Sequence, residues 1–466
     1  MLFTQPIFFL FFFCVLLFLI CTSNYTLKKR GLLFASYLFY AYWDWRFLSL
    51  IFFSTMVDYY VGKGLKRTSK KGRRRLLLWI SMICNLGLLG IFKYFNFFLG
   101  SLRFALEPLG LNLNALDIVL PVGISFYTFQ TMSYTIDVYR NKIKTCDNLL
   151  DFALFVAFFP QLVAGPIVRA SDFLYQLQTP RLMTRAFAFE GGKQFIIGLF
   201  KKAFIADNLA VFIDYTFSSP DEFNGYTLWI AAIAYSIQIY CDFSGYSDMA
   251  IGAARIMGFS FPRNFNLPYL ATSPSDFWRR WHISLSTWLR DYLYIPLGGS
   301  RKGRVRTYIN LMITMLLGGL WHGASWNFVL WGLWHGLALA INRAVQELTF
   351  LPRISHHVRA LLGWVITMLI VLCGWVLFRS ANLHQAWNIL FRMFTLSNGI
   401  SRYQTFPILL IALVVLTNLA HTIPTIRCRL QLKPNKTTTI FVLFVMVWLV
   451  IFFHPADYQP FIYFQF

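Results

Sequence analysis

The chain has 466 residues, of which 57% are hydrophobic and only 13% are charged. An ordinary soluble domain is about 45–50% apolar and about 25% charged, so this composition excludes a soluble globular protein. Lysine and arginine outnumber aspartate and glutamate by 42 to 19. The basic residues gather in short runs between apolar stretches, for example at residues 63–75 and 301–306, which is the positive-inside pattern of membrane proteins and argues against a nucleic-acid partner.

The apolar stretches set the expected fold class. A membrane-spanning helix needs about 20 mostly apolar residues, and the runs at residues 6–21, 76–91 and 438–453 contain no charged side chain. Packing the apolar stretches at that length predicts on the order of ten to twelve spans, together with re-entrant or interfacial helices. We therefore expect an all-α polytopic integral membrane protein. The expected organisation is one membrane-embedded domain over residues 1–466, with N-terminal spans over 1–118, a core over 119–345 and C-terminal spans over 346–466.

Polar residues interrupt the apolar pattern at several places. Residues 120–130 and 158–166 hold proline, glycine and polar side chains within apolar stretches. Such backbone is tolerated at membrane depth where protein or a cavity satisfies the freed polar groups, so the second stretch is expected to be re-entrant. Further on, Asp242 and Asp248 end an apolar run and precede Arg255. These carboxylates form either an interfacial ion pair or cap, or a group that shapes the site.

A helix is expected over residues 273–293. Ser273 is a good N-cap, and Pro274 suits the first helical position. Along a continuous helix, four polar side chains share one stripe at steps of three, four and four residues: Arg279, His282, Ser286 and Arg290. The segment is too short and too charged for an obvious span, so we expect an interfacial or re-entrant amphipathic helix. Its histidine is either presented to a site or incidental on a lipid-surface helix.

A second histidine, His322, lies between two long apolar runs, with Gly318, Gly319 and Gly323 close to it. We expect a helix, a break and a second helix here, because glycine lets a substrate or another segment approach the imidazole. Ionisable side chains at membrane depth are costly and usually face a water-filled cavity or a substrate path. A histidine can also gain or lose a proton near neutral pH, so the position predicts a catalytic base.

Other motifs narrow the chemistry. His335 lies 13 residues after His322, about 220° around a continuous helix, so the two could not face one metal ion. We expect no metal and no bound cofactor, and His335 is either structural or functional. The sequence contains no Ser-His-Asp order, nucleophile elbow, P-loop or dinucleotide fingerprint. The chemistry therefore rests on histidine, which can activate a hydroxyl or thiol for attack on an activated acyl group.

Three motifs carry a resemblance to a known family. They are Phe277-Trp278-Arg279-Arg280-Trp281-His282-Ile283-Ser284-Leu285-Ser286, Asp291-Tyr292-Leu293-Tyr294-Ile295-Pro296-Leu297-Gly298-Gly299 and Trp321-His322-Gly323. With them, nearly the whole chain, including residues 461–466, resembles the membrane-bound O-acyltransferases. Within that family it is similar to the branch of the alginate O-acetyltransferase membrane subunit and the peptidoglycan O-acetyl exporter.

The resemblance implies a catalytic histidine at His322 and a second functional histidine at His282. It also implies a ring of membrane helices around a funnel that reaches the active site from both sides. We expect His322 to act as a general base or as a transient acyl carrier. The residues expected to bind or orient donor or acceptor are Arg279, Arg280, Trp281, Ser286, Trp321 and Asn327.

These observations predict a multi-pass O-acetyltransferase of the bacterial inner membrane. It would take an acetyl group from a cytoplasmic donor, acetyl-CoA or an acyl carrier protein, and pass it through the membrane. The acceptor would be an extracytoplasmic polysaccharide, reached through a periplasmic or membrane-anchored partner acetyltransferase. The other expected partners are membrane lipids, and no nucleic acid. The alternatives are D-alanyl transfer to a teichoic acid-like acceptor, a transporter, and a non-catalytic scaffold subunit.

Overall fold

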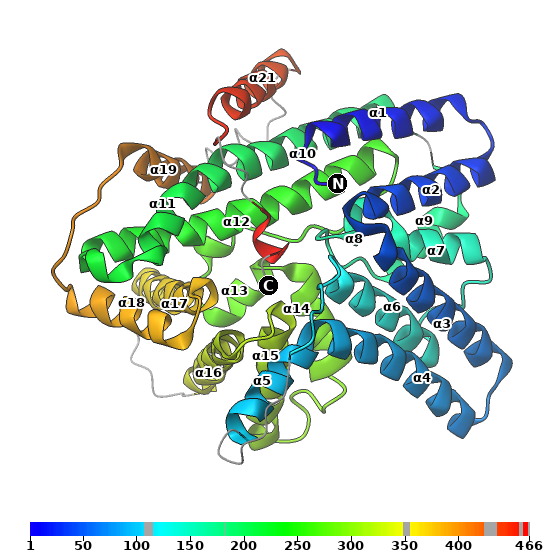
Figure 1. Ribbon diagram of the computed structural model, residues 1–466, viewed down its shortest axis with the longest axis horizontal. Coiled ribbons are helices and arrows are strands. Elements are labelled where there is room, and N and C mark those ends of the chain that lie inside the picture. Colours follow the sequence, from blue (N-terminus) through cyan, green and yellow to red (C-terminus); the bar gives the residue numbers. More distant parts are fainter. Residues whose placement is uncertain (107–114, 182, 348–354, 424–435, 456–459, 465–466) are drawn as a thin grey trace. The chain divides into compact units, whose positions relative to one another are not determined.

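The computed structural model describes residues 1–106, 115–181, 183–347, 355–423, 436–455 and 460–464. These residues are mainly helical and contain no β-strand beyond an isolated bridge between Phe223 and Ile400. The expected all-α class is therefore confirmed (Figure 1). The described chain divides into two compact units, with residues 1–195 and 247–262 in unit 1 and residues 196–246 and 263–466 in unit 2. The predicted single catalytic domain and its internal boundaries stay predictions.

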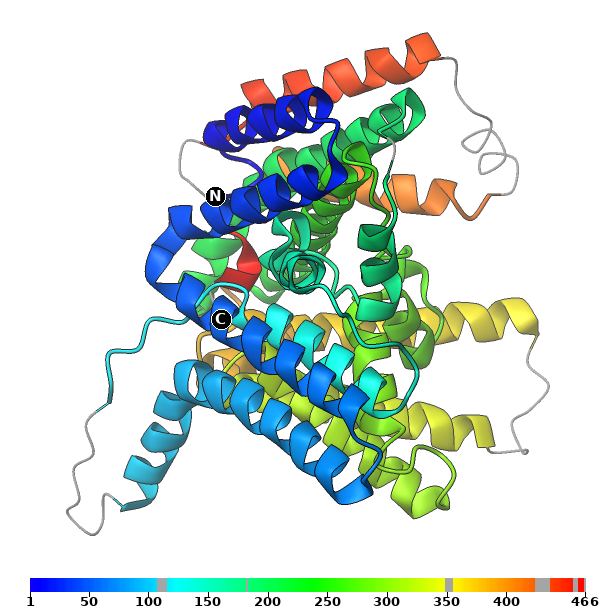
Figure 2. The same cartoon turned by 90° about the vertical axis from the view of Figure 1, so that its right-hand side faces the viewer.

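Unit 1 is built from helical hairpins that share buried polar contacts. Asp58 on α3 accepts hydrogen bonds from Ser81 and Asn85 on α4 and from Thr135 on α6. Figure 2 shows α3 and α4 running side by side in blue. A buried ion pair between Lys29 and Asp151, 2.5 Å long, joins α2 to α7. The helices of unit 1 are α1 (Pro6–Cys21), α2 (Tyr25–Asp44), η1 (Trp45–Phe47), α3 (Leu48–Arg67), α4 (Lys71–Leu89), η2 (Gly90–Tyr94), α5 (Phe95–Leu106), α6 (Ile124–Tyr139), α7 (Leu149–Ala157), α8 (Phe159–Leu162), α9 (Ala170–Gln178) and most of α10 (Arg185–Leu199).

Unit 2 holds both histidine motifs and a core rich in aromatic side chains. Its buried rings include Phe277, Trp281 and Trp375, with Trp281 4.8 Å from Trp375 and 5.6 Å from Phe277. The helices of unit 2 are η4 (Phe200–Ala206), α11 (Asp207–Ser218), η5 (Pro220–Glu222), most of α12 (Gly225–Ile256), η6 (Pro268–Leu270), α13 (Pro274–Arg280), α14 (Ile283–Leu289), η7 (Arg290–Tyr294), α15 (Arg304–His322), α16 (Trp326–Glu347), α17 (His356–Arg379), α18 (Leu383–Thr395), α19 (Thr405–Ala420), α21 (Lys436–Phe452) and η8 (Ile462–Phe464).

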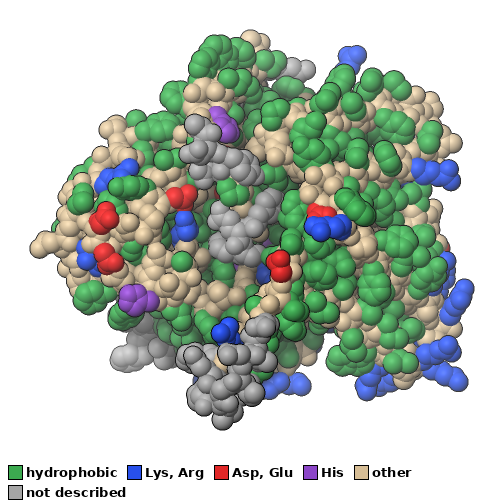
Figure 3. Space-filling model, viewed as in Figure 1, with side chains coloured by type: hydrophobic (Ala, Val, Ile, Leu, Met, Phe, Trp, Pro, Cys, Tyr) green, Lys and Arg blue, Asp and Glu red, His purple; other side chains and the backbone are tan. Residues whose placement is uncertain are grey.

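Several helices have the length and composition of membrane spans. Among the described residues three helices qualify, over Lys71–Arg103, Trp326–Glu347 and His356–Arg379. Shorter apolar helices of 10–17 residues lie at Pro6–Cys21, Thr405–Ala420 and Thr437–Phe452. Hydrophobic side chains cover much of the face shown in Figure 3, as expected where lipid rather than water surrounds the helices. The predicted total of ten to twelve spans and the predicted funnel stay predictions.

The interrupted stretches form short helices and turns. Gly123, with φ 78°, precedes α6, and its left-handed conformation starts that helix after Pro121. The expected re-entrant stretch contains the one-turn helix α8, and its residues 158–166 are all buried. The helix α13 confirms the predicted start, because Ser273 accepts a hydrogen bond from the Asp276 N–H and Pro274 occupies the first helical turn.

Candidate active site

The hairpin of α15 and α16 positions His322. The predicted helix, break and helix are present, but the break falls after His322, and Gly318 and Gly319 remain helical. Gly319 has a packing role, since a Cβ there would lie 2.2 Å from the Phe328 carbonyl oxygen. Gly332 on α16 is equally tight, with a Cβ placed 2.4 Å from the Met315 carbonyl oxygen. The two backbones therefore approach closely, and His322 ends the first of the two helices.

His322 is surrounded by aromatic rings from three other segments. The ring centroid of its imidazole lies 5.0 Å from Trp331 on α16, 5.3 Å from Phe378 on α17 and 5.6 Å from Tyr463 on η8. Trp321, its neighbour in sequence, lies 5.1 Å away. Only 4% of the residue is exposed. Such packing restricts the rotation of the imidazole and keeps bulk water from most of its surface.

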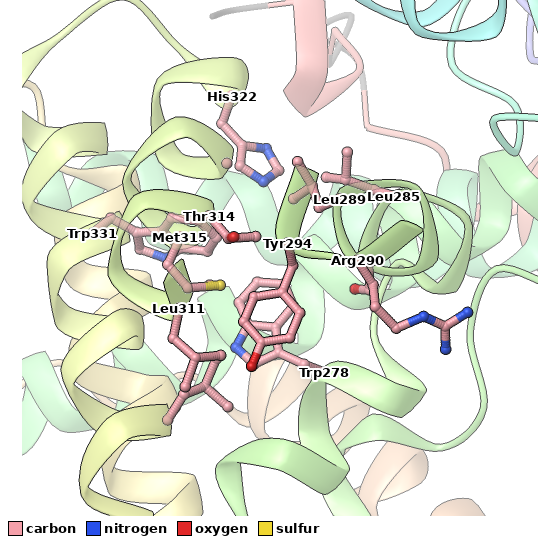
Figure 4. Close-up of a pocket in the computed structure, with 13 residues that line it drawn as sticks. Trp278, Leu285, Leu289, Arg290, Tyr294, Leu311, Thr314, Met315, His322 and Trp331 are labelled. Carbon is pink, nitrogen blue, oxygen red and sulfur yellow. The ribbon is translucent and has the colours of Figure 1, made fainter. Parts of the chain in front are cut away.

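One side of His322 faces a cavity of about 210 Å³. Figure 4 shows the imidazole at one end of this space and the guanidinium of Arg290 turned away from it. The Arg290 side chain pairs with Asp291 and is 59% exposed, so this end of the cavity lining lies near the surface of unit 2. The lining is mostly apolar and comes from α13 to α16: Trp278, Leu285, Ser286, Leu289, Arg290, Tyr294, Leu311, Thr314, Met315, Gly318, His322, Trp331 and Leu339.

The expected continuous helix over residues 273–293 is wrong. It is divided into α13, α14 and η7, with a turn at His282, whose φ of 42° and ψ of 56° are left-handed. The shared polar stripe predicted for this segment therefore does not form. The physical reason lies 18 residues upstream, where the Asn264 carbonyl oxygen accepts from the Ile283 N–H and the Asn264 side chain accepts from the Ser284 N–H. These tertiary hydrogen bonds replace those of a continuing helix.

His282 is completely buried, which excludes an incidental histidine on a lipid-facing helix. Its Nδ1 lies 3.2 Å from Asn264 Oδ1, the same atom that accepts from the Ser284 N–H and hydroxyl. A carbonyl oxygen can only accept, so Nδ1 carries the proton and Nε2 holds the lone pair. His282 lies outside the candidate spans, and burial lowers its pKa to about 3. The imidazole is therefore neutral, and its Nε2 has no hydrogen-bond partner among the described residues.

Two rings are common neighbours of the two histidines. Trp321 lies 5.9 Å from His282 and 5.1 Å from His322, and Tyr463 lies 6.4 Å and 5.6 Å from them. Phe243 on α12 closes the other side of His282 at 4.6 Å. The structure thus brings together the two histidines predicted from distant motifs.

The residues predicted to orient substrate fall into different places. Ser286 lines the cavity and donates to the Trp281 carbonyl oxygen, and Trp321 contacts both histidines. Trp281 is buried in the aromatic core of unit 2. Their substrate roles stay predictions.

Three further polar residues of unit 2 lie away from the cavity lining of the described chain. Arg279 is exposed, and Arg280 pairs with Asp276 at 2.9 Å. Asn327 donates to the Ser380 carbonyl oxygen at 2.7 Å, which ties α16 to α17. Their predicted roles in orienting donor or acceptor are untested by this geometry.

His335 has an environment of a different kind. It is 1% exposed and packs against Trp331 at 4.8 Å and Trp278 at 5.2 Å. A Cβ on Gly374 would lie 2.6 Å from His335 Nε2, so α17 covers that nitrogen. Within the described residues it does not line the cavity, and this placement favours a structural role.

Two residues of this site were missed by sequence reasoning. Asn264 lies in a loop 18 residues before His282, and Tyr463 lies 141 residues after His322. No local motif marks either position. The aromatic ending of the chain was noted as part of the resemblance, and that signal could have led to Tyr463; its last two residues lie outside the described ranges.

Comparison with known proteins identifies the family. The model of the MBOAT, membrane-bound O-acyltransferase family matches residues 45–383. The probable alginate O-acetylase AlgI of Pseudomonas aeruginosa is 46% identical over 398 residues, covering 85% of this chain and 75% of that protein. The peptidoglycan O-acetyltransferase of Helicobacter pylori is 38% identical, covering 81% and 76%. The teichoic acid D-alanyltransferase of Bacillus subtilis is 28% identical, covering 56% and 69%.

The match spans both histidine motifs and most of the chain, and the helices include several that could cross a membrane. The chain is therefore a multi-pass membrane protein and an acyltransferase, and it belongs to the membrane-bound O-acyltransferase family.

Proposed function

We propose that this protein is an O-acetyltransferase of the bacterial inner membrane that serves O-acetylation of an extracytoplasmic polysaccharide. The observation that carries the proposal is the apolar cavity that ends on the His322 imidazole. Relatives that align over most of the chain are named alginate O-acetylase and peptidoglycan O-acetyltransferase, which supports an acetyl group as cargo and a polysaccharide as its destination.

The proposed reaction transfers acetyl from a thioester to an oxygen. His322 removes the proton of the acceptor hydroxyl while that oxygen attacks the thioester carbonyl carbon. The tetrahedral intermediate then expels the thiolate as its C–S bond breaks, and the imidazolium returns the proton to sulfur. The products are an acetyl ester and a thiol. Because the cavity is mostly apolar, it holds the acetyl group without competing polar contacts.

The donor enters from the Arg290 end of the cavity. The basic residues at 301–306 lie in the loop before α15 and in its first turn, and all of them are exposed. Positive charge marks cytoplasmic segments of membrane proteins. A donor that carries phosphate groups, such as acetyl-CoA or the prosthetic arm of an acyl carrier protein, would meet favourable charge there. A partner acetyltransferase on the other side of the membrane would complete the transfer to the polysaccharide.

The mostly apolar lining of the cavity favours acetyl over D-alanyl as cargo. A D-alanyl ester carries an ammonium group at neutral pH, and a desolvated ammonium needs an acidic partner. The lining of the cavity in the described chain includes no carboxylate that could pair with it. The similarity to the D-alanyltransferase also covers less of the chain than the similarity to the acetylating relatives.

The test is transfer of radiolabelled acetyl into membranes that contain the full chain, with acetyl-CoA and an acetylated carrier protein supplied separately. We expect label in ester form from one donor, and its loss in His322→Ala at unchanged protein level. His335→Phe is the matched control, because it replaces a buried histidine away from the cavity. Acetylation that persists in His322→Ala would overturn the assignment, and a label that only crosses the membrane without ester formation would indicate a transporter.

The same membranes also test a second role for His322, that of a transient acyl carrier. Rapid quenching of wild-type protein with labelled donor, but no acceptor, should leave no acetyl on His322 if it acts as a general base. A stoichiometric acetyl-imidazole that disappears when acceptor is added would replace the general-base role by a covalent one.

A further inference from the structure

A buried lysine lies between two carboxylates in unit 2. Lys202 Nζ is 2.6 Å from Asp242 Oδ1 and 2.7 Å from Asp207 Oδ1, and no more than 7% of any of the three side chains is exposed. Lys202 belongs to the π-helical turn η4, and Asp242 lies on α12. One cation thus meets two carboxylates. Buried charges are tolerated only when their remaining lone pairs are satisfied, so Asp242 needs a further donor.

That donor comes from the other end of the chain. The backbone N–H of Ile462 donates to Asp242 Oδ2 at 2.9 Å. Ile462 is the first residue of η8, where the backbone N–H has no acceptor within the helix. Figure 1 shows this short turn in red beside α12. This hydrogen bond therefore satisfies both Asp242 Oδ2 and the Ile462 N–H, two buried groups that each need a partner.

The same turn places Tyr463 at the two histidines. The Tyr463 ring lies 4.3 Å from Phe243, 5.6 Å from His322 and 6.4 Å from His282. Phe461, on the other side of Ile462, packs against Tyr246 at 4.8 Å. Ile462 is itself 4% exposed. The contact between Asp242 and the Ile462 N–H therefore fixes the residue immediately before the ring that both imidazoles touch.

We propose that Asp242 and Lys202 are positioning residues for acyl transfer. Lys202 holds the Asp242 carboxylate in place, and Asp242 holds the 461–463 turn so that Tyr463 stays packed against His322 and His282. The inference rests on the proposed function, because acetyl transfer is its readout. The competing role for the same ion group is to hold η4 to α12, with no effect on the histidines beyond general stability.

The decisive pair of variants is Ile462→Pro and Ile462→Ala. Proline removes the N–H that Asp242 accepts, and its fixed φ is tolerated at the first position of a helix. Alanine shortens the side chain but keeps the N–H. We expect Ile462→Pro to lower kcat by about 10²-fold, the usual effect of a small misplacement at a reacting centre, while Ile462→Ala stays near wild type. The donor KM should change less than twofold, because the cavity lining contains no residue of α12 or η8 in the described chain.

A double-variant cycle separates positioning from stability. Asp242→Asn keeps an oxygen that can accept the Ile462 N–H but loses the charge that Lys202 holds, so we expect it to lower kcat. If both residues act through one contact, Asp242→Asn combined with Ile462→Pro should be no slower than the slower single variant. Multiplied losses would mean that the two act independently, and would overturn the proposal.

The matched control is the other buried ion pair, Lys29 and Asp151 in unit 1. Asp151→Asn removes a similar charge and should lower the melting temperature while kcat per folded protein is unchanged. Equal kcat losses in Asp151→Asn and Asp242→Asn would show a merely structural effect. If Asp242→Asn does not fold, the two Ile462 variants still decide, since wild-type kcat in Ile462→Pro overturns the proposal. Failure of the proposed function would instead appear as the absence of ester-linked label from the wild-type protein with either donor.

Discussion

His322 and His282 share two aromatic neighbours, yet their surroundings differ in kind. His322 ends a helix and faces a cavity, while His282 lies on a left-handed turn and is held through Nδ1 by Asn264. The first has space for a reactant beside it. The second has a fixed tautomer and a buried Nε2 acceptor. The difference teaches that two histidines from family motifs can have different surroundings. The open space beside His322 is the reason for proposing proton transfer there and an orienting role for His282.

The largest expected effect tests the His322 half of this comparison. His322→Ala should lower acetyl transfer by about 10²–10⁴-fold, the range for loss of a general acid–base group. The melting temperature should fall as well, because the variant removes a buried ring packed against four aromatic side chains. The measurement is ester-linked label per folded protein, and activity within tenfold of wild type would assign the proton transfer elsewhere.

The next effect tests the support of His282. Asn264→Ala removes the acceptor of the His282 Nδ1–H, the Ser284 N–H and the Ser284 hydroxyl. We expect kcat to fall by about 10²-fold as the imidazole loses its orientation, and stability to fall by about 1–3 kcal/mol because buried donors lose their acceptor. Steady-state kinetics and thermal unfolding measure the two effects. Asn85→Ala, a buried asparagine of unit 1, should show only the second effect, so normal kcat in Asn264→Ala would remove His282 from the mechanism.

A smaller expected effect, on the donor KM, tests whether the cavity binds the donor. Gly318 lines the cavity, and a Cβ there would lie 3.1 Å from Leu289 Cδ1. Gly318→Ala should therefore narrow the space and raise the donor KM by about tenfold, as an added methyl in a packed site costs about 1–3 kcal/mol. A propionyl donor should lose more than an acetyl donor.

The neighbouring glycine is the control for that variant. Gly319→Ala places a methyl against backbone rather than a flexible side chain, 2.2 Å from the Phe328 oxygen, so it should reduce folded protein instead of changing KM. If the two variants behave alike, the cavity seen at Gly318 is not the donor site.

The smallest expected effect concerns His335. His335→Phe fills the same aromatic pocket between Trp278 and Trp331 and removes the ionisable ring. Because this histidine lies off the cavity, we expect kcat and KM within about threefold of wild type. A loss comparable with that of His322→Ala would make His335 a third functional histidine and break the distinction drawn from access.

The sequence predicts the helical membrane class, the family and both histidines because each is written in local composition or in a contiguous motif. The N-cap at Ser273 also follows from the neighbouring residues alone, and the structure confirms it. The turn at His282 could not be predicted, since no glycine or proline marks it and its hydrogen bonds come from Asn264. Tyr463 lies at the site in a turn whose Ile462 N–H donates to Asp242, 220 residues earlier in the chain. Long-range contacts of this kind are absent from any periodicity or motif.

The left-handed turn at His282 has a conformational cost. A side chain with a Cβ pays roughly 1–3 kcal/mol for such a backbone conformation, whereas glycine pays almost nothing. Drift toward glycine at this position would relax the backbone and simultaneously delete the imidazole. Glycine would also leave the space of the buried ring empty and remove the Nδ1–H donor of the Asn264 oxygen. The imidazole thus offsets the strain of its own backbone through packing and this hydrogen bond.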